Sequence, residues 1–223
     1  MKRSELAKMI DHTLLGPTAS DEAVRILCAE ADANGFASVC INPCHVRLAK
    51  ELLSESEAKV CTVIGFPHGM NTAAVKGIEA ERAIADGADE LDMVINVAAL
   101  KQKAHQRVLE DIVKVCSAAR KARRPVAVKV ILEIAWLTEE EISFGSVLAK
   151  AAGADFVKTS TGFGPGGATV EAVALMRRTV GAEIGVKAAG GIRDYETAMA
   201  MIEAGATRIG ASKSLAILQG AEE

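Results

Sequence analysis

The chain has 223 residues, with 26 Lys and Arg against 29 Asp and Glu, and a formal net charge of −3 at pH 7. This balance gives no electrostatic case for binding nucleic acid or a membrane surface. Half of the residues are hydrophobic but only 3% are aromatic, so the core must consist mainly of Ala, Val, Ile and Leu, as in layered α/β folds. We find no signal-peptide pattern, no apolar run of about 20 residues and no linker, and we expect a cytoplasmic, single-domain protein.

Short β-branched segments alternate with Ala-rich segments of helical period along the chain, a pattern typical of a parallel sheet with crossover helices. The expected strands are 9–13, 38–42, 59–66, 90–96, 126–133, 155–161, 184–189 and 207–210. The expected helices are 20–33, 43–55, 71–86, 103–122, 139–152, 169–180, 194–204 and 212–218. Eight such units predict one closed (β/α)₈ TIM barrel spanning residues 1–223.

Local signals at the ends of the expected helices support this division. Thr138 and Glu141 form a capping-box pattern, and Asp194 stands where an N-cap is needed. Four glycines follow Ala-rich helices and precede the even-numbered strands: Gly35, Gly87, Gly153 and Gly205. We expect these glycines to end their helices in the left-handed conformation.

The five cysteines are irregularly spaced, so we expect free thiols. Cys40, Cys44 and His45 lie within six residues, but no second Cys/His pair completes a zinc site. We therefore predict no metal site.

Two lysines lie inside apolar, β-rich segments, Lys158 in the sixth expected strand and Lys187 in the seventh. Burial disfavours the charged form of an amine and lowers its pKa, and a neutral amine is a nucleophile. The alternative for each lysine is a structural ion pair or a side chain that reaches the barrel rim. Asp92 lies in the fourth strand, and the mouth of a barrel would bring all three side chains together.

Glycine-rich segments follow the same strands. Backbone amides at Gly190, Gly191 and Gly210, together with Ser212 before the last helix, can bind a phosphate group. Tight-turn glycines without a ligand are the alternative. Residues 162–167 satisfy the pattern G-x-G-x-x-G, but this segment follows the sixth strand and contains Pro165, so we interpret it as a lip over the phosphate and not as a dinucleotide site.

Further polar residues occupy expected strands: Asp11 and Thr13 in the first, Lys129 and Glu133 in the fifth. Charges inside a barrel can form a structural ion pair, and we favour this interpretation for Lys129. His12 and His68 lie near strand ends and His45 and His105 on helix surfaces, without a partner motif that would make any of them catalytic.

These segments together resemble deoxyribose-phosphate aldolase, a family of class I aldolases. The resemblance is carried by residues 10–15 (IDHTLL), 39–43 (VCINP), 63–69 (VIGFPHG), 90–96 (ELDMVIN), 128–133 (VKVILE), 156–163 (FVKTSTGF) and 186–193 (VKAAGGIR). It implies reversible cleavage of 2-deoxy-D-ribose 5-phosphate to glyceraldehyde 3-phosphate and acetaldehyde without a cofactor.

The resemblance also implies roles for residues. Lys158 would form the Schiff base, Lys187 would lower the pKa of Lys158, and Asp92 would act with Lys187 in a proton relay. The phosphate would be held by Gly162, Gly190, Gly191, Gly210 and Ser212. A third group, Asp11, Thr13, Lys129 and Thr161, would contact the sugar hydroxyl or order the network. Cys40 matches a family cysteine that can react with aldehydes, with a core thiol as the alternative.

The chain departs from the family at three places. Some members have a C-terminal tyrosine that aids proton transfer, whereas the only tyrosine here is Tyr195. Residues 134–136 (IAW) follow Glu133 where family members often have a threonine, and Lys213 stands where a small residue is common after Ser212. The alternatives to the implied function are another class I aldolase acting on a longer sugar phosphate, or a catalytically silent barrel that binds a sugar phosphate. The expected partners are small sugar phosphates and aldehydes, and Ala-rich helix faces leave a homodimer open.

Overall fold

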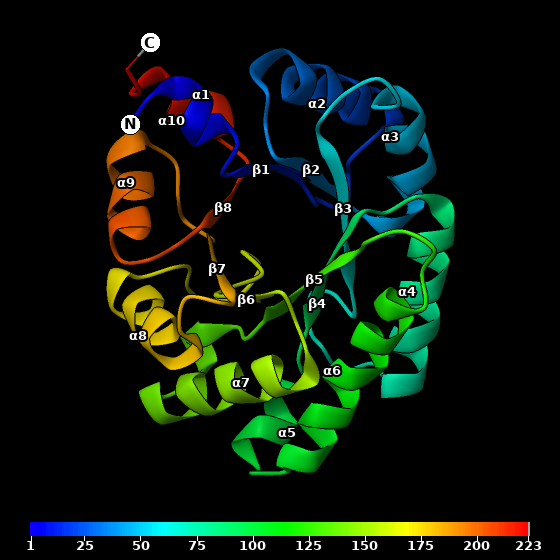
Figure 1. Ribbon diagram of the computed structural model, residues 1–223, viewed down its shortest axis with the longest axis vertical. Helices are drawn as coiled ribbons and strands as arrows, with labels where there is room; N and C mark the ends of the chain where they lie inside the picture. Colours follow the sequence, from blue (N-terminus) through cyan, green and yellow to red (C-terminus); the bar gives the residue numbers. More distant parts are fainter. Residues whose placement is uncertain (223) are drawn as a thin grey trace.

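In the computed structural model, which describes residues 1–222, eight parallel strands form a closed barrel in which each strand pairs with its neighbours in the sequence and β8 pairs with β1. Figure 1 looks down this barrel, with the helices arranged around the strands. The strands are β1 (Ile10–Leu14), β2 (Ser38–Ile41), β3 (Lys59–Ile64), β4 (Glu90–Val94), β5 (Ala127–Ile131), β6 (Phe156–Lys158), β7 (Gly185–Ala189) and β8 (Arg208–Ala211). The predicted (β/α)₈ barrel and the order of its eight strands are confirmed, but β5 and β6 end at Ile131 and Lys158, before their predicted ends at residues 133 and 161.

The helices that follow the strands cover the outside of the barrel. They are α2 (Asp21–Asn34), α3 (Val46–Leu52), α4 (Ala73–Asp86), α5 (Val97–Lys101), α6 (His105–Arg120), α7 (Glu139–Ala152), α8 (Val170–Val180), α9 (Tyr195–Glu203) and α10 (Ser214–Gln219), preceded by α1 (Arg3–Ala7). Two 3₁₀ helices, η1 (Pro43–His45) and η2 (Ile134–Trp136), follow β2 and β5.

Three details of the helices differ from the sequence predictions. The segment 43–55 begins as η1 and only then continues as α3, because Pro43 occupies the first position of a tight turn. A short helix, α5, precedes α6 where the sequence predicted a single helix from residue 103. The N-terminal helix α1 was not predicted, because five residues are too few to show a helical period.

The predicted helix ends are confirmed. The Thr138 side chain accepts a hydrogen bond from the amide of Glu141, and Asp194 caps α9 in the same way. Gly35, Gly87, Gly153 and Gly205 have positive φ angles of 66°, 116°, 82° and 112°. This left-handed region is costly for residues with a Cβ atom, so the sequence requires glycine there.

The two ends of the chain meet at one side of the barrel, where α1 and α10 lie side by side in Figure 1. The amide of Arg3 donates a hydrogen bond of 2.7 Å to the carbonyl of Glu222. Near the same place, the buried His12 of β1 contacts Ser214 of α10 at 3.0 Å and Glu30 of α2 at 2.7 Å. His12 therefore joins the first strand to the helices that cover it.

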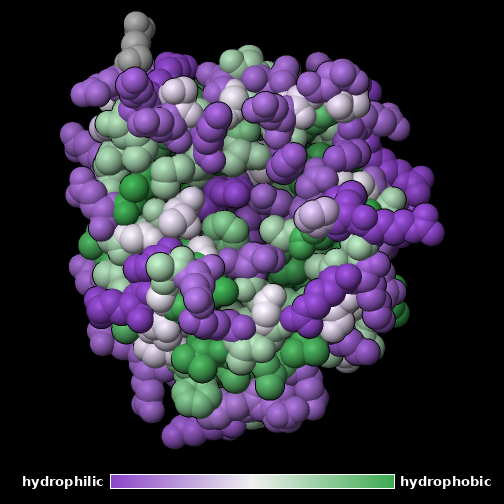
Figure 2. Space-filling model, viewed as in Figure 1, coloured by the Kyte–Doolittle hydropathy of each residue, from purple (hydrophilic) through white to green (hydrophobic). Residues whose placement is uncertain are grey.

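The main hydrophobic core lies between the strands and the surrounding helices, and a second, small cluster of Leu15, Cys40, Cys61 and Val63 is separate from it. The surface in Figure 2 is mostly hydrophilic, with hydrophobic residues gathered in the lower part of the view over α5 and α7. Phe144 and Val147 of α7 are among the exposed hydrophobic residues. Within residues 1–222, no helix has the length and apolar character needed to cross a membrane.

Candidate active site

A cavity of about 340 Å³ opens at the carboxyl ends of β1, β6, β7 and β8. In a (β/α)₈ barrel this end of the strands forms the mouth where active sites lie. Of the residues proposed from the sequence, the cavity is lined by Thr13, Lys158, Thr161, Gly162, Gly190, Gly191, Gly210 and Ser212. The structure therefore brings together, in one cavity, eight of the twelve catalytic and substrate-binding residues proposed from the sequence.

Two lysines share one carboxylate oxygen beneath this cavity. The Nζ atoms of Lys158 and Lys187 each donate to Oδ2 of Asp92 at 2.7 Å, so the two amines lie within about twice that distance of each other. Lys158 retains 3% exposure and reaches the cavity, whereas Lys187 is fully buried. The proximity that the barrel mouth predicted for these three residues is confirmed.

The charges around Asp92 fix its protonation state. Burial alone would raise the pKa of the Asp92 carboxyl, but the ammonium groups of Lys129, Lys158 and Lys187 hold this pKa well below its usual range. Burial would likewise lower the pKa of Lys187, but the carboxylates of Asp11 and Asp92 raise it above the usual value. Asp92 is therefore an anion and Lys187 a cation at pH 7.

Asp11 and Lys129 lie below the cavity and have no exposed surface. Asp11 accepts a hydrogen bond from Lys187, and Lys129 donates to Asp92 at 2.9 Å and pairs with Glu90 at 2.5 Å. Burial would lower the pKa of Lys129, but the facing acidic groups, Asp92 foremost, raise it well above its usual value. The resemblance implied that these residues either contact the sugar hydroxyl or order the network of charges. For Asp11 and Lys129 the geometry supports the second role.

The loops after β6 and β7 touch through their backbones at the cavity. The amide of Ala168 donates to the carbonyl of Gly190 at 3.0 Å. A Cβ atom on Gly167 would lie 2.1 Å from that same carbonyl oxygen, a distance that no side chain tolerates. Gly167 is therefore required because its chain packs directly against the loop after β7, and this requirement accounts for the last glycine of the G-x-G-x-x-G pattern without a dinucleotide.

Glu133 holds the start of the loop after β6. Thr161 donates its hydroxyl hydrogen to Glu133 Oε2, and its backbone amide lies 3.3 Å from both carboxylate oxygens. Glu133 has a φ angle of 60°, unusual for a residue with a Cβ atom. We considered Glu133 as part of a strand ion pair, and the structure contradicts this because its partner is Thr161, one of the residues that line the cavity.

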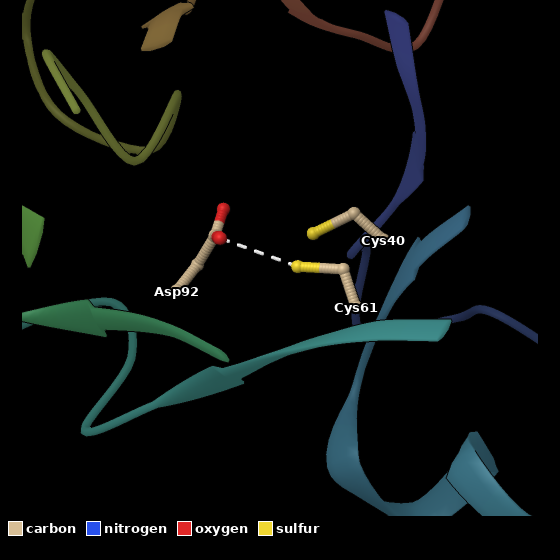
Figure 3. A group of neighbouring side chains, drawn as sticks. All are labelled: Cys40, Cys61 and Asp92. Atoms are coloured by element: carbon tan, nitrogen blue, oxygen red, sulfur yellow. Dashed lines mark hydrogen bonds between the residues drawn. The ribbon is translucent and has the colours of Figure 1, made fainter. Parts of the chain in front are cut away.

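Cys40 and Cys61 lie on the register-paired strands β2 and β3, and Figure 3 shows their sulfur atoms side by side and close to Asp92. The Cys61 thiol donates to Asp92 Oδ1 at 3.2 Å. The spacing of these three residues would admit a metal ion. However, the carboxylate already binds lysine ammonium groups through both oxygens, and this cationic surrounding opposes a metal cation.

Sequence reasoning missed several residues of the site. Arg193 lines the cavity, and Glu90 and Arg208 pair with the buried charges below it. Glu90 could have been found from its spacing, because residues two apart in a strand face the same side, and Asp92 faces the interior.

Tyr195 does not line the cavity; it begins α9, and its hydroxyl accepts a hydrogen bond from the amino group of Met1.

A closed (β/α)₈ barrel with two lysines and a shared carboxylate beneath a glycine-lined cavity at its mouth has the architecture of a barrel enzyme. The chain belongs to the DeoC/LacD family of aldolases, whose sequence model matches residues 6–220. It is accordingly an aldolase, and thus a lyase.

Named relatives extend this assignment. The chain is 58% identical over 220 residues to the deoxyribose-phosphate aldolase of Clostridium perfringens strain 13, covering 99% of this chain and 97% of that protein. It is 56% identical over 214 residues to the deoxyribose-phosphate aldolase of Caldanaerobacter subterraneus subsp. tengcongensis, covering 96% and 92%. The tetrameric deoxyribose-phosphate aldolase of Aeropyrum pernix has a similar structure, with a TM-score of 0.91 and 34% identity over 98% of this chain and 91% of that chain.

Proposed function

We propose that this aldolase reversibly cleaves 2-deoxy-D-ribose 5-phosphate to D-glyceraldehyde 3-phosphate and acetaldehyde through a Schiff base on Lys158. The observation that carries this proposal is that Lys158 is the amine of the buried charged cluster that lines the cavity. The substrate is supported by the relatives in Clostridium perfringens and Caldanaerobacter, which are 58% and 56% identical over nearly the full chain.

The chemistry begins when the neutral amine of Lys158 adds to the aldehyde carbon C1 of the open-chain sugar, and loss of water with uptake of one proton gives a protonated imine. Loss of the proton from the C3 hydroxyl then breaks the C2–C3 bond and releases glyceraldehyde 3-phosphate. The electron pair of that bond remains on the two-carbon fragment as an enamine. Protonation of C2 and hydrolysis of the imine release acetaldehyde and restore the amine.

Lys187 and Asp92 would serve the proton transfers. Lys187 shares Asp92 Oδ2 with Lys158, and a neighbouring cation favours the neutral form of the reacting amine. Asp92, as a buried anion, can hold the protons that leave and return through water. The short connection Lys158–Asp92–Lys187 thus supplies a nucleophile, a carboxylate and a charged amine in one place.

The phosphate would bind where Gly190 and Gly191 after β7, and Gly210 and Ser212 at the end of β8, line the cavity and can offer backbone amides and a hydroxyl. Arg193 adds a cation to the same wall. Binding the phosphate there places the sugar between the glycine-rich loops and Lys158. Thr13 and Thr161 line the space between and can contact a sugar hydroxyl.

The test is borohydride trapping in the presence of 2-deoxyribose 5-phosphate, followed by intact mass and peptide mapping. We expect a reduced adduct on the peptide that contains Lys158, and none in Lys158→Ala, which should also lose cleavage activity. Folded wild-type protein that forms no adduct, or a Lys158→Ala variant with near-normal turnover, would refute the proposal. A longer sugar phosphate trapped faster than the five-carbon substrate would redirect it to another aldolase reaction.

Three further features belong to the proposal. The reaction needs no metal or organic cofactor, so a chelator should leave turnover unchanged. A cytoplasmic location fits five free cysteines, which are usual in a reducing compartment. A homodimer stays a prediction; the exposed Ile78 of α4 and Val147 of α7 offer faces for it.

A further inference from the structure

Six charged side chains form a closed ring of alternating sign inside the barrel below the cavity. Asp11 joins Arg208 through Oδ1 at 2.6 Å and Lys187 through Oδ2. Asp92 joins Lys187 through Oδ2 at 2.7 Å and Lys129 through Oδ1 at 2.9 Å.

Glu90 closes this ion ring. Its Oε2 atom lies 2.5 Å from Lys129 Nζ and 3.1 Å from Arg208 Nη1. Every member of the ring therefore contacts at least two members of opposite charge, and Asp11 and Lys129 also lie 3.7 Å from each other. The ring draws on five strands, with Asp11 on β1, Glu90 and Asp92 on β4, Lys129 on β5, Lys187 on β7 and Arg208 on β8.

The charges of the ion ring cancel, because three carboxylates face three cations. Lys158 is bonded to the ring from outside, through the one Asp92 oxygen that it shares with Lys187. A protonated Lys158 thus gives the buried cluster one uncompensated positive charge. An uncompensated charge in a buried site is costly, and the cost is relieved when one amine loses its proton.

The contacts within the ion ring also determine which of the three lysine amines loses its proton. Lys187 is held by two carboxylates and Lys129 by three, whereas within residues 1–222 Lys158 contacts only one. Lys158 is also the member of the cluster that lines the cavity, where a proton can leave to water. We propose that Glu90 and Arg208 are positioning residues that keep the ion ring neutral, so that the excess proton of the cluster is the one on Lys158. This inference rests on the proposed function, in which Lys158 is the reacting amine.

The alternative is that Glu90 and Arg208 only stabilise the fold. Arg208 also lies over the ring of Phe156, 5.3 Å from its centroid, a contact that serves packing. The two interpretations differ in whether removal of a ring charge changes the pH at which the amine of Lys158 reacts.

The titratable and charged groups around the Lys158 amine are, by strand, Asp11 (β1), Cys40 (β2), Cys61 (β3), Glu90 and Asp92 (β4), Lys129 (β5), Lys187 (β7) and Arg208 (β8).

The experiment measures the pH dependence of Schiff-base formation with acetaldehyde, trapped with cyanoborohydride and quantified on the Lys158 peptide. Acetaldehyde has no ionising group in this range, and peptide mapping excludes reactions of the thiols. Glu90→Gln removes a negative charge from the ring, so the midpoint of the acid limb should move to lower pH. Arg208→Met removes a positive charge, so the midpoint should move to higher pH. Each shift should be about one pH unit, the effect of a unit charge about 10 Å away at an effective dielectric constant of about 20.

Two further variants separate charge from fold. The double variant Glu90→Gln/Arg208→Met restores neutrality and should return the midpoint to within about 0.3 pH units of wild type, since the two shifts of similar size cancel. Arg208→Lys keeps the charge and should also retain the wild-type midpoint. Arg124→Met is the matched control, because it removes a cation that pairs with Asp89 outside the ring.

Each outcome has a distinct meaning. Opposite shifts in the two single variants, with recovery in the double variant, support the proposal. Shifts in the same direction, or unchanged midpoints in variants that are folded by circular dichroism, overturn it. Wild-type protein without an adduct on Lys158 overturns the proposed function instead. If Arg208→Met does not fold, a midpoint in Glu90→Gln that equals wild type is sufficient to reject the inference.

Discussion

At the scale of single residues, each carboxylate oxygen of Asp92 accepts two hydrogen bonds. Oδ2 accepts from Lys158 and Lys187, and Oδ1 accepts from Lys129 and Cys61. Donors on both oxygens prevent rotation of the carboxylate, which fixes Oδ2 between the two amines. The position of Lys158 relative to Lys187 is therefore determined by groups that do not reach the cavity.

We predict that Lys187→Leu folds but loses most activity at pH 7. The variant removes one cation, so that a protonated Lys158 is exactly compensated by the remaining charges and keeps its proton. Cleavage of 2-deoxyribose 5-phosphate should fall by roughly 100-fold or more, the range of a lost acid–base group. Activity should recover partly as the pH is raised, which steady-state kinetics from pH 6 to about pH 10, near the ordinary value of a lysine amine, would measure.

The matched control is Lys50→Leu, which removes a half-exposed lysine paired with Asp89 on the outside of the barrel. Such surface pairs contribute about 0–1 kcal/mol, so activity should be unchanged. A Lys187→Leu variant as inactive at high pH as at pH 7 would show that Lys187 acts in another way.

The sequence predicted Lys158, Lys187 and Asp92 because charged residues inside apolar strands are rare and need a reason. It did not predict Glu90 and Arg208, because each stands at the first residue of its strand, where a charge is ordinarily solvated. Their burial depends on the closure of the barrel, which places β8 beside β1. A closed ring of contacts between five strands has no signature in any one segment.

At the scale of elements, the loops after β6 and β7 form one wall of the cavity and depend on each other. We predict that Gly167→Ala weakens binding of the phosphorylated substrate. The added Cβ atom would meet the Gly190 carbonyl at 2.1 Å and push that loop away from the phosphate. Loss of one charge-assisted hydrogen bond corresponds to about a tenfold rise in KM, with kcat less affected.

Gly77→Ala is the matched control for this substitution. Gly77 lies inside α4, and its added Cβ atom would meet only the Lys114 side chain, at 3.8 Å. Alanine favours the helix over glycine by about 0.5–1 kcal/mol, so the control should raise the thermal midpoint and leave kinetics unchanged. Equal KM values for Gly167→Ala and wild type would mean that the two loops do not hold the phosphate together.

Element boundaries show where sequence reasoning stops. Helix ends marked by Thr138, Asp194 and the four left-handed glycines were predicted correctly, because capping and positive φ are local requirements. The short helix α5 was missed. It is followed by Lys103, which adopts a φ angle of 56°, and nothing in the sequence marks this lysine as a turn residue. Tertiary packing of α5 against α7 accompanies that turn.

At the scale of the whole molecule, the barrel interior has an unusual core, because ion pairs occupy space that branched apolar side chains fill in most barrels. Replacing one partner of a buried ion pair leaves an uncompensated charge, at a cost of about 3–5 kcal/mol. The fold therefore depends on the protonation of these carboxylates as a set, and stability should follow pH through them.

We predict that Asp11→Asn both lowers stability at pH 7 and weakens the response of stability to acid. Burial would raise the pKa of Asp11, but the charges of Lys187, Lys129 and Arg208 lower it below its usual value. Because the folded-state pKa is below the unfolded one, this carboxyl stabilises the protein above about pH 4 and loses its effect as the pH falls toward the folded-state value. Urea unfolding from pH 7 to about pH 2, below the unfolded-state value, would measure both effects.

The control for this prediction is Asp86→Asn at the surface, where Asp86 accepts a hydrogen bond from Arg47 and the pKa of its carboxyl is lowered by that contact. Its stability curve should stay close to that of wild type. The decisive comparison is the slope below pH 4, the range in which the unfolded carboxyl takes up a proton. A curve for Asp11→Asn that runs parallel to wild type through this range would show that Asp11 does not couple folding to pH. A flatter curve would show that the acid sensitivity of the barrel arises from the buried charges around Lys158.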